Sequence, residues 1–91
     1  MRIRVRVFYP ELQKLFQGRD SIEVSGRTVG ECLNDLVKQY PGAGKLIFDS
    51  QGRLLNQVYV YVNAEGVNKA DFSQPVTDND ELLLAVLITG G

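Results

Sequence analysis

The 91-residue sequence contains no histidine, which removes the commonest general base at neutral pH and every Ser-His-Asp or Cys-His arrangement. Without histidine, one chain also cannot assemble the usual zinc ligand sets, and its single cysteine cannot form an internal disulfide. We therefore expect a reduced protein with no metal and no bound cofactor. Any chemistry in which it takes part is expected to need the active site of a partner.

Charge of one sign and long hydrophobic runs are also lacking. Ten basic and 11 acidic residues give a formal net charge of −1, so there is no electrostatic reason to bind nucleic acid or anionic lipid. No apolar run approaches the roughly 18 residues that suit a membrane span, and the N-terminus alternates arginine with apolar residues instead of resembling a signal peptide. We expect one soluble, cytoplasmic domain with neither nucleic acid nor membrane as a partner.

The apolar residues that are present first follow a strand pattern. Residues Arg2 to Phe8 alternate strictly, with apolar Ile3, Val5 and Val7 on one face and Arg2, Arg4 and Arg6 on the other. Residues Asp20 to Ser25 alternate again, and the spacing of apolar residues from Glu11 to Phe16 suits a short helical turn. The two alternating runs predict an N-terminal hairpin with a long connection.

A helix is predicted to begin after Thr28. Thr28 and Glu31 match a capping box, in which Thr28 accepts from the Glu31 amide while the Glu31 side chain reaches back. Apolar residues then recur at three- and four-residue spacing until Pro41-Gly42 ends the helix. Cys32 lies within this stripe, so a buried, unreactive thiol is the expected role, and catalytic use is the less favoured alternative.

The second half of the chain predicts more strands. Residues 43 to 57 read as an irregular segment with a short apolar anchor, and Val58 to Asn63 alternate as a strand. Residues 63 to 66 and 78 to 80 are expected turns. Leu82 to Ile88 is uninterruptedly apolar, as in a central strand that is covered on both faces, or covered on one and adhesive on the other. The order predicts an α+β fold, with a mixed sheet wrapped over one main helix.

Several of these features together resemble one protein family. They are the order of elements, the Arg2 to Phe8 strand, Thr28 at the helix start, and the motifs Tyr61-Val62-Asn63, Asp78-Asn79-Asp80 and Thr89-Gly90-Gly91. The whole chain resembles the ubiquitin-like (β-grasp) sulfur carriers of the MoaD/ThiS family, which end in Gly-Gly. The resemblance implies a β-grasp domain over residues 1–88 and a flexible reactive tail over residues 89–91.

The resemblance further implies a carrier or co-substrate, not an enzyme. An ATP-dependent, E1-like adenylating enzyme would adenylate the Gly91 carboxylate, and a sulfur donor would convert it to a thiocarboxylate. ATP and the donor would be used by that partner. A sulfur-accepting synthase, either the molybdopterin synthase large subunit or an enzyme of the cysteine synthase type, would then take the sulfur for cofactor, cysteine or thiamin-type biosynthesis.

A partner surface is expected on the outer face of the sheet. If Leu82, Leu84 and Val86 face the helix, alternation places the residues between them on the opposite face. Contiguous apolar surface commonly marks an interaction site. The expected partner-binding residues are Tyr59, Tyr61, Leu83, Leu87, Ile88, Thr89 and Gly90. Ala85 and the arginines Arg2, Arg4 and Arg6 share this face, where the arginines either pair with a partner's acidic residues or form an ordinary solvated surface.

Alternatives remain at this stage. The chain could be a protein modifier joined to lysine amines through Gly91, or a β-grasp binding module without a reactive tail, because small residues are common at frayed chain ends. Reversed strand parity or a covering loop would remove the partner surface. Many molybdopterin synthase small subunits have prolines before the terminal segment, whereas this chain has Ala85-Val86-Leu87-Ile88, so the acceptor pathway stays open.

Overall fold

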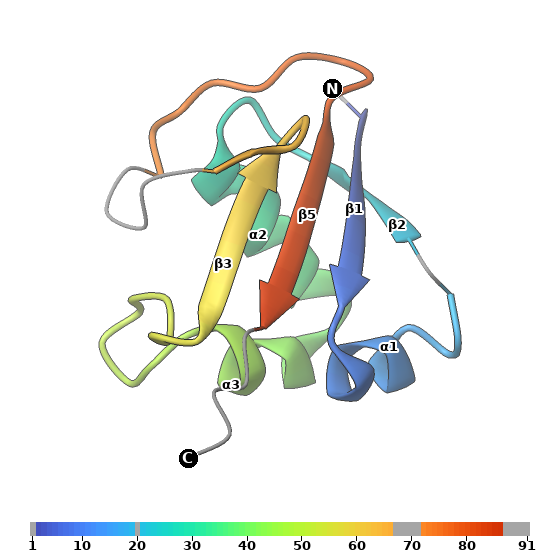
Figure 1. Cartoon of the computed structure of the whole chain (residues 1–91), viewed down its shortest axis with the longest axis vertical. Coiled ribbons are helices and arrows are strands. Elements are labelled where there is room, and N and C mark those ends of the chain that lie inside the picture. The colour runs from blue at the N-terminus through green and yellow to red at the C-terminus, as the bar shows by residue number, and fades with distance from the viewer. Residues whose placement is uncertain (1, 20, 67–71, 87–91) are drawn as a thin grey trace.

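A computed structural model describes residues 2–19, 21–66 and 72–86 (Figure 1). Strand β1 (Arg2–Phe8) pairs antiparallel with β2 (Ser21–Ser25) and parallel with β5 (Glu81–Val86). On the other side of β5 lies antiparallel β3 (Val58–Val62), which pairs with β4 (Glu65–Gly66). The strand order is β2-β1-β5-β3-β4, so the expected mixed sheet is confirmed, with the first and last strands as neighbours at its centre.

Strand alternation decides which face of the sheet forms the core. Leu82 and Leu84 of β5 are completely buried, whereas Leu83 and Ala85 are half-buried on the opposite face. Helix α2 (Val29–Gln39) crosses behind β3, β5 and β1 in Figure 1. Of the two expected arrangements for the last strand, the described residues have the one in which helices cover one face and leave the other without a helix. The predicted strand parity is confirmed.

Helix α2 begins as the capping pattern predicts. The Glu31 amide donates to Oγ1 of Thr28 at 3.2 Å, while Oε1 of Glu31 accepts from the amide of Arg27, one residue before the cap. The helix buries one apolar stripe against the sheet, consisting of Val29, Cys32, Leu33 and Leu36. Pro41 follows two residues after its last residue, where a proline cannot continue the helix.

The connection between β1 and β2 closes one end of the core. Helix α1 (Pro10–Leu15) has proline at its first position, where the missing amide costs nothing. Leu12 and Phe16 are buried, and the Phe16 ring lies 4.7 Å from the Tyr40 ring, centroid to centroid. The N-terminal hairpin with a long, partly helical connection is therefore confirmed.

Residues 43 to 57 are more regular than the sequence indicates. A 3-10 turn, η1 (Pro41–Ala43), leads directly into α3 (Gly44–Ile47), and Ile47 is the buried anchor. Phe48 and Leu54 then form an isolated β-bridge. Between them, Oδ1 of Asp49 accepts from the amides of Gln51 and Arg53. The expected irregular segment is thus partly wrong, because burial of Ile47 and the Asp49 turn fix a short helix and a tight loop.

The expected turn at residues 63 to 66 contains a strand. Only Asn63 and Ala64 form the turn, with φ angles of 49° and 71°, the left-handed values that a two-residue hairpin turn requires at both positions. Glu65 and Gly66 already pair with β3 as β4. Val67, at which the apolar side chain after the turn favours the start of a short strand, lies outside the described residues.

Candidate functional site

The outer face of the central strands brings together three of the predicted partner-binding residues, Tyr59, Tyr61 and Leu83. Tyr61 lies opposite Leu83, and Tyr59 lies opposite Ala85, across the β3–β5 ladder. Residues directly opposite in a ladder share a face, so these four side chains are neighbours on the side away from α2. All four are half-buried, so the face is less open than the expected exposed apolar patch.

Strand β1 adds Phe8 to this face, a residue that is not among the predicted partner-binding residues. Phe8 lies at the level of Ala85 across the parallel β1–β5 ladder, so Phe8 and Tyr59 flank Ala85 from its two sides. Phe8 is 58% exposed, and among the described residues it is the one large hydrophobic residue that is exposed. The signal was available, because Phe8 has the same parity as Arg2, Arg4 and Arg6. We call Phe8, Tyr59, Tyr61, Leu83 and Ala85 the outer apolar face.

Arginines border the outer apolar face along β1. Arg6 lies level with Leu83, its guanidinium carbon is 5.9 Å from the centre of the Phe8 ring, and its Nη1 is 3.8 Å from Oε1 of Glu81. Nε of Arg2 is 3.9 Å from Oε2 of Glu23. These ion pairs are exposed and contribute little to stability. The arginines therefore stay available to a partner, although two of them already have an acidic neighbour.

A polar network fixes the start of β5, at the far end of the strand from residue 86. The side-chain amide of Asn63 donates to Oδ1 of Asp80 at 2.9 Å, and its Oδ1 accepts from the Glu81 amide at 3.0 Å. Oδ2 of Asp80 accepts from the Thr77 amide at 2.8 Å. Because Asn63 and then Thr77 donate to the charged carboxylate, they hold the pKa of Asp80 below its usual value. The two motifs that carry the resemblance here, at residues 61–63 and 78–80, thus meet in space.

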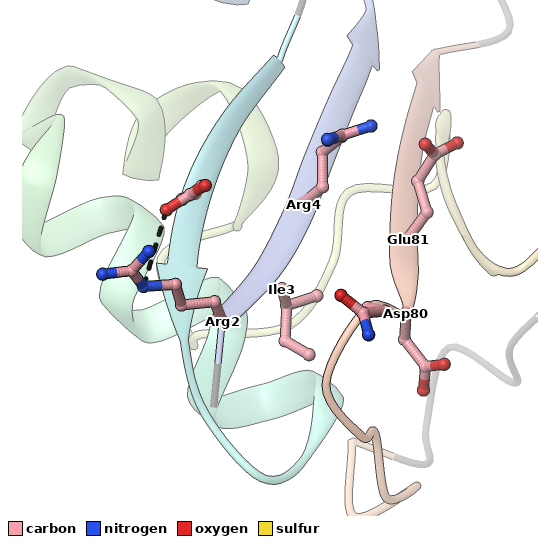
Figure 2. A pocket seen from close by; sticks show the side chains of 7 residues that line it. Arg2, Ile3, Arg4, Asp80 and Glu81 are labelled. Carbon is pink, nitrogen blue, oxygen red and sulfur yellow. Dashed lines mark ion pairs between the residues drawn. The ribbon is translucent and has the colours of Figure 1, made fainter.

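A shallow pocket of about 400 Å³ lies beside this network (Figure 2). Arg2 and Arg4 line it together with the acidic residues Glu23, Asp80 and Glu81. Figure 2 shows the arginine side chains among these carboxylates, with the Arg2–Glu23 ion pair dashed. A lining of mixed charge does not select an anion or a cation. The pocket lies at the Glu81 end of β5, the opposite end of the strand from Val86.

The N-terminus of α2 offers no anion site, because its first amides already have acceptors. The amides of Val29 and Gly30 donate to the carbonyls of Gln74 and Phe72, and that of Glu31 donates to the Thr28 hydroxyl. The Cys32 amide donates to the carbonyl of Thr28. The bonds of Val29 and Gly30 anchor the segment that leads to β5 against the helix.

Cys32 is buried, as predicted. Its side chain has no exposed surface, and desolvation, followed by the charges of Glu31 and Asp35, raises the thiol pKa to about 11. The thiol is therefore protonated at neutral pH. Within the described ranges, no group of three or more potential ligands lies close enough to hold a metal ion, and no helix is long and apolar enough to cross a bilayer.

The remaining predicted site residues are Leu87, Ile88, Thr89, Gly90 and Gly91, and they lie outside the described residues. The proposed division into a domain over 1–88 and a tail over 89–91 consequently stays a prediction. The described chain brings β5, the strand that precedes these residues, to the centre of the sheet between Phe8 and Tyr59.

The mixed five-stranded sheet wrapped over α2 defines a ubiquitin-like β-grasp protein. The profile of the ThiS family matches residues 6–91. The sulfur carrier protein CysO of Mycobacterium tuberculosis is 31% identical over 77 residues, covering 81% of this chain and 83% of that protein. The chain belongs to the ThiS family, and it is a sulfur carrier, not a catalyst.

Solved structures agree with this assignment. The CysO structure from the Amycolatopsis orientalis BexX/CysO complex has a TM-score of 0.83 and 27% identity, covering 98% of this chain and 99% of that chain. The small archaeal modifier protein 1 of Haloferax volcanii has a TM-score of 0.82 and 23% identity, covering 96% and 98%. The first similarity links the chain to a carrier that is found in complex with a partner protein. The second shows the shared fold alone.

Proposed function

We propose that the carboxylate of Gly91 is the group that carries sulfur. A carboxylate is a poor electrophile, so an activating enzyme would first join it to the AMP moiety of ATP and release pyrophosphate. A hydrosulfide equivalent from a sulfur donor would then displace AMP and leave a thiocarboxylate. The nucleophilic sulfur of that group would attack an activated carbon atom in a second enzyme.

The chain's own residues support a passive role in these steps. The sequence has no histidine, and its single thiol is buried and protonated. Two terminal glycines provide a thin end without side chains, which suits entry into narrow active sites of two different enzymes. The domain would therefore act as a handle that partners recognise while they perform the chemistry.

One observation carries the proposal: the strand that precedes the Gly-Gly end is flanked by an apolar face. Phe8 and Tyr59 lie on either side of Ala85, next to the last described residues of β5. A partner that docks on this face would be positioned to receive the residues that follow Val86. Leu87, Ile88, Thr89 and Gly90 would then extend the contact into the partner's active site.

The fitting partner has an apolar contact surface with acidic residues at one margin. Tyrosine and phenylalanine are common interface anchors, and Arg4 and Arg6 border them on β1. An ATP-dependent adenylating enzyme and a sulfur-accepting synthase would use this face in turn. Since both need the same tail, their complexes with the carrier would exclude each other.

For the acceptor, we favour an enzyme of the cysteine synthase type over the molybdopterin synthase large subunit. The 31% identity to a sulfur carrier protein CysO, over most of both chains, supports this choice. The absence of proline from Ala85-Val86-Leu87-Ile88 also departs from the pattern of many molybdopterin synthase small subunits. The modifier alternative rests on similarity of fold alone.

Intact-protein mass spectrometry tests the proposal directly. The chain, produced together with its activating enzyme and a sulfur source, should gain the mass that corresponds to replacing one oxygen atom by sulfur. A variant that lacks Gly91 is the control and should gain nothing. An unchanged mass in the full chain, or the same gain without Gly91, would contradict the proposal. Conjugates that survive denaturant and require Gly91 would favour the modifier function instead.

A further inference from the structure

Strand β2 is an edge of the sheet, and within the part of the chain that the structure describes its outer backbone groups face no neighbouring strand. The Ser25 amide donates to Oδ2 of Asp35 at 3.0 Å, and the Glu23 carbonyl accepts from Nε2 of Gln39 at 3.0 Å. Both bonds are made to α2 instead of β1, so these groups point away from the sheet. Because alternate residues of a strand point their backbone groups the same way, Ser21, Glu23 and Ser25 form the open edge.

Asp35 and Gln39 act as one unit. They are four residues apart on α2, so they lie on the same side of the helix, and Nε2 of Gln39 also donates to Oδ2 of Asp35 at 2.9 Å. The pair thus supplies an acceptor for the Ser25 amide and a donor for the Glu23 carbonyl. Unpaired edge groups are a template for another strand, and native proteins commonly block them.

We propose that Asp35 and Gln39 close the β2 edge against strand addition, and that their removal opens it to β2 of a second copy of this chain. Two copies can pair antiparallel about Glu23, so that Glu23 faces its own copy and Ser21 faces Ser25. The Glu23 carbonyl and the Ser25 amide would take part in the ladder, and these are the groups that the helix side chains occupy.

A second copy of this chain is the fitting partner for the β2 edge, because two identical edges that pair antiparallel place backbone donors opposite backbone acceptors. Ile22 and Val24 alternate with the edge residues and are buried, so the strand already has a formed core face. The antiparallel arrangement would continue the sheet on that side. Glu23 opposes such a pairing, because its carboxylate would lie directly opposite an identical charge, although Arg2 partly offsets this at 3.9 Å.

The test compares the association of purified full-length chains by sedimentation velocity over a range of concentrations. Wild type should sediment as a monomer, and the double variant Asp35→Ala/Gln39→Ala should double its mass as concentration rises. Lys38→Ala, an exposed position on the same helix, is the control and should remain monomeric. Hydrogen exchange shows whether the contact between the two copies lies at β2. The Ser25 amide should be protected in wild type, unprotected in the dilute double variant, and protected again in the dimer of that variant.

Two further variants make the outcome decisive. Gln39→Glu keeps the size of the side chain but removes the donor to the Glu23 carbonyl, so it should also promote association if the double variant fails to fold. Glu23→Pro, added to an associating variant, removes an edge amide and should restore the monomer. Folded variants that stay monomeric would overturn the proposal. So would a dimer that persists with Glu23→Pro, or a wild-type chain that already pairs through this edge.

Discussion

Gly26 shows how a single residue sets the distance between β2 and α2. A Cβ atom at this position would lie 2.7 Å from the Cys32 backbone nitrogen, 2.9 Å from Cys32 Sγ and 2.9 Å from Cβ of Glu31. Contacts this short require movement, and the nearest atom belongs to the helix backbone. Cys32 is also completely buried, so its side chain has no free space to enter. Glycine is therefore needed for close approach between the strand and the helix.

We predict that Gly26→Ala lowers the free energy of unfolding by about 1–3 kcal/mol, the usual cost of overpacking a core. Urea denaturation should show a lower midpoint with an unchanged slope. Gly44→Ala is the matched control, because its Cβ would meet Val37 Cγ1 at an ordinary 3.5 Å and Gly44 already has helical backbone angles. Equal midpoints for the two variants would contradict this explanation.

For Cys32, the sequence predicts burial but not the full electrostatic environment of the thiol. Its place in the apolar stripe of α2 predicts a buried thiol, and the structure confirms this prediction. The raised pKa of the thiol then follows from burial and two nearby carboxylates, which the stripe alone does not place. The consequence for function is direct, because a buried, protonated thiol is not available to relay sulfur to the chain end.

At the scale of elements, the network of Asn63 and Asp80 joins the end of β3 to the start of β5. Asn63 can do this because it accepts a left-handed backbone, which frees its side chain to pair with Asp80 and the Glu81 amide. Its own amide donates to the Glu81 carbonyl at 2.9 Å. The register of the central strand is thereby fixed at its first residue.

The lowered pKa of Asp80 gives this network a pH dependence. Because the folded pKa lies below the unfolded value, the ionised group stabilises the fold above the unfolded pKa, and this contribution is lost as pH falls through the folded pKa. We predict that Asp80→Asn is less stable than wild type at neutral pH and that the difference shrinks in acid, below about pH 4. Thermal unfolding at a series of pH values measures this.

Carboxyl NMR of wild type provides an independent check on Asp80. The group should titrate below its ordinary value of about 3.9. A titration at or above that value, or a stability difference between wild type and Asp80→Asn that stays constant into acid, would show that the network does not stabilise the charged form.

Elements with a long and regular pattern of apolar residues could be predicted from the sequence, whereas short elements could not. Strict alternation identified β1, β2 and β3, and the capping pattern with the apolar stripe identified α2. Helix α3 has four residues, too few for a helical period to appear. Glu65 and Gly66 of β4 were assigned to the turn because the left-handed backbone of Ala64, which closes the turn after two residues, is not suggested by its residue type. Tertiary pairing with β3 decides that conformation.

At the scale of the molecule, the two faces of the sheet have different roles. Helices α1, α2 and α3 enclose the core on one side and one end of the sheet, while the other face carries the outer apolar face (Figure 1). Parity along β3 and β5 was sufficient to predict Tyr59, Tyr61 and Leu83 there. Parity along β1 also placed Phe8 on this face, but its position beside Ala85 depends on the parallel register. The roles of residues 87–91 stay predictions.

The outer apolar face leads to a prediction that separates docking from tail chemistry. Phe8→Ala removes an exposed ring without opening the core, so thermal stability should change little. If Phe8 anchors the activating enzyme, its loss should weaken binding about tenfold, or ~1.4 kcal/mol. KM for the carrier should then rise while kcat stays close to that of wild type. Lys38→Ala, on the exposed side of α2, is the control and should leave both constants unchanged.

Removing Gly90 and Gly91 should have the opposite pattern. This variant keeps the outer apolar face, so it should still bind the activating enzyme and compete with the full chain, but it should form no thiocarboxylate. Calorimetric titration of each variant with the enzyme, beside steady-state adenylation, distinguishes the two contributions. Undiminished binding by Phe8→Ala would place the docking surface elsewhere, because a half-exposed aromatic ring at the centre of an interface contributes measurably to affinity.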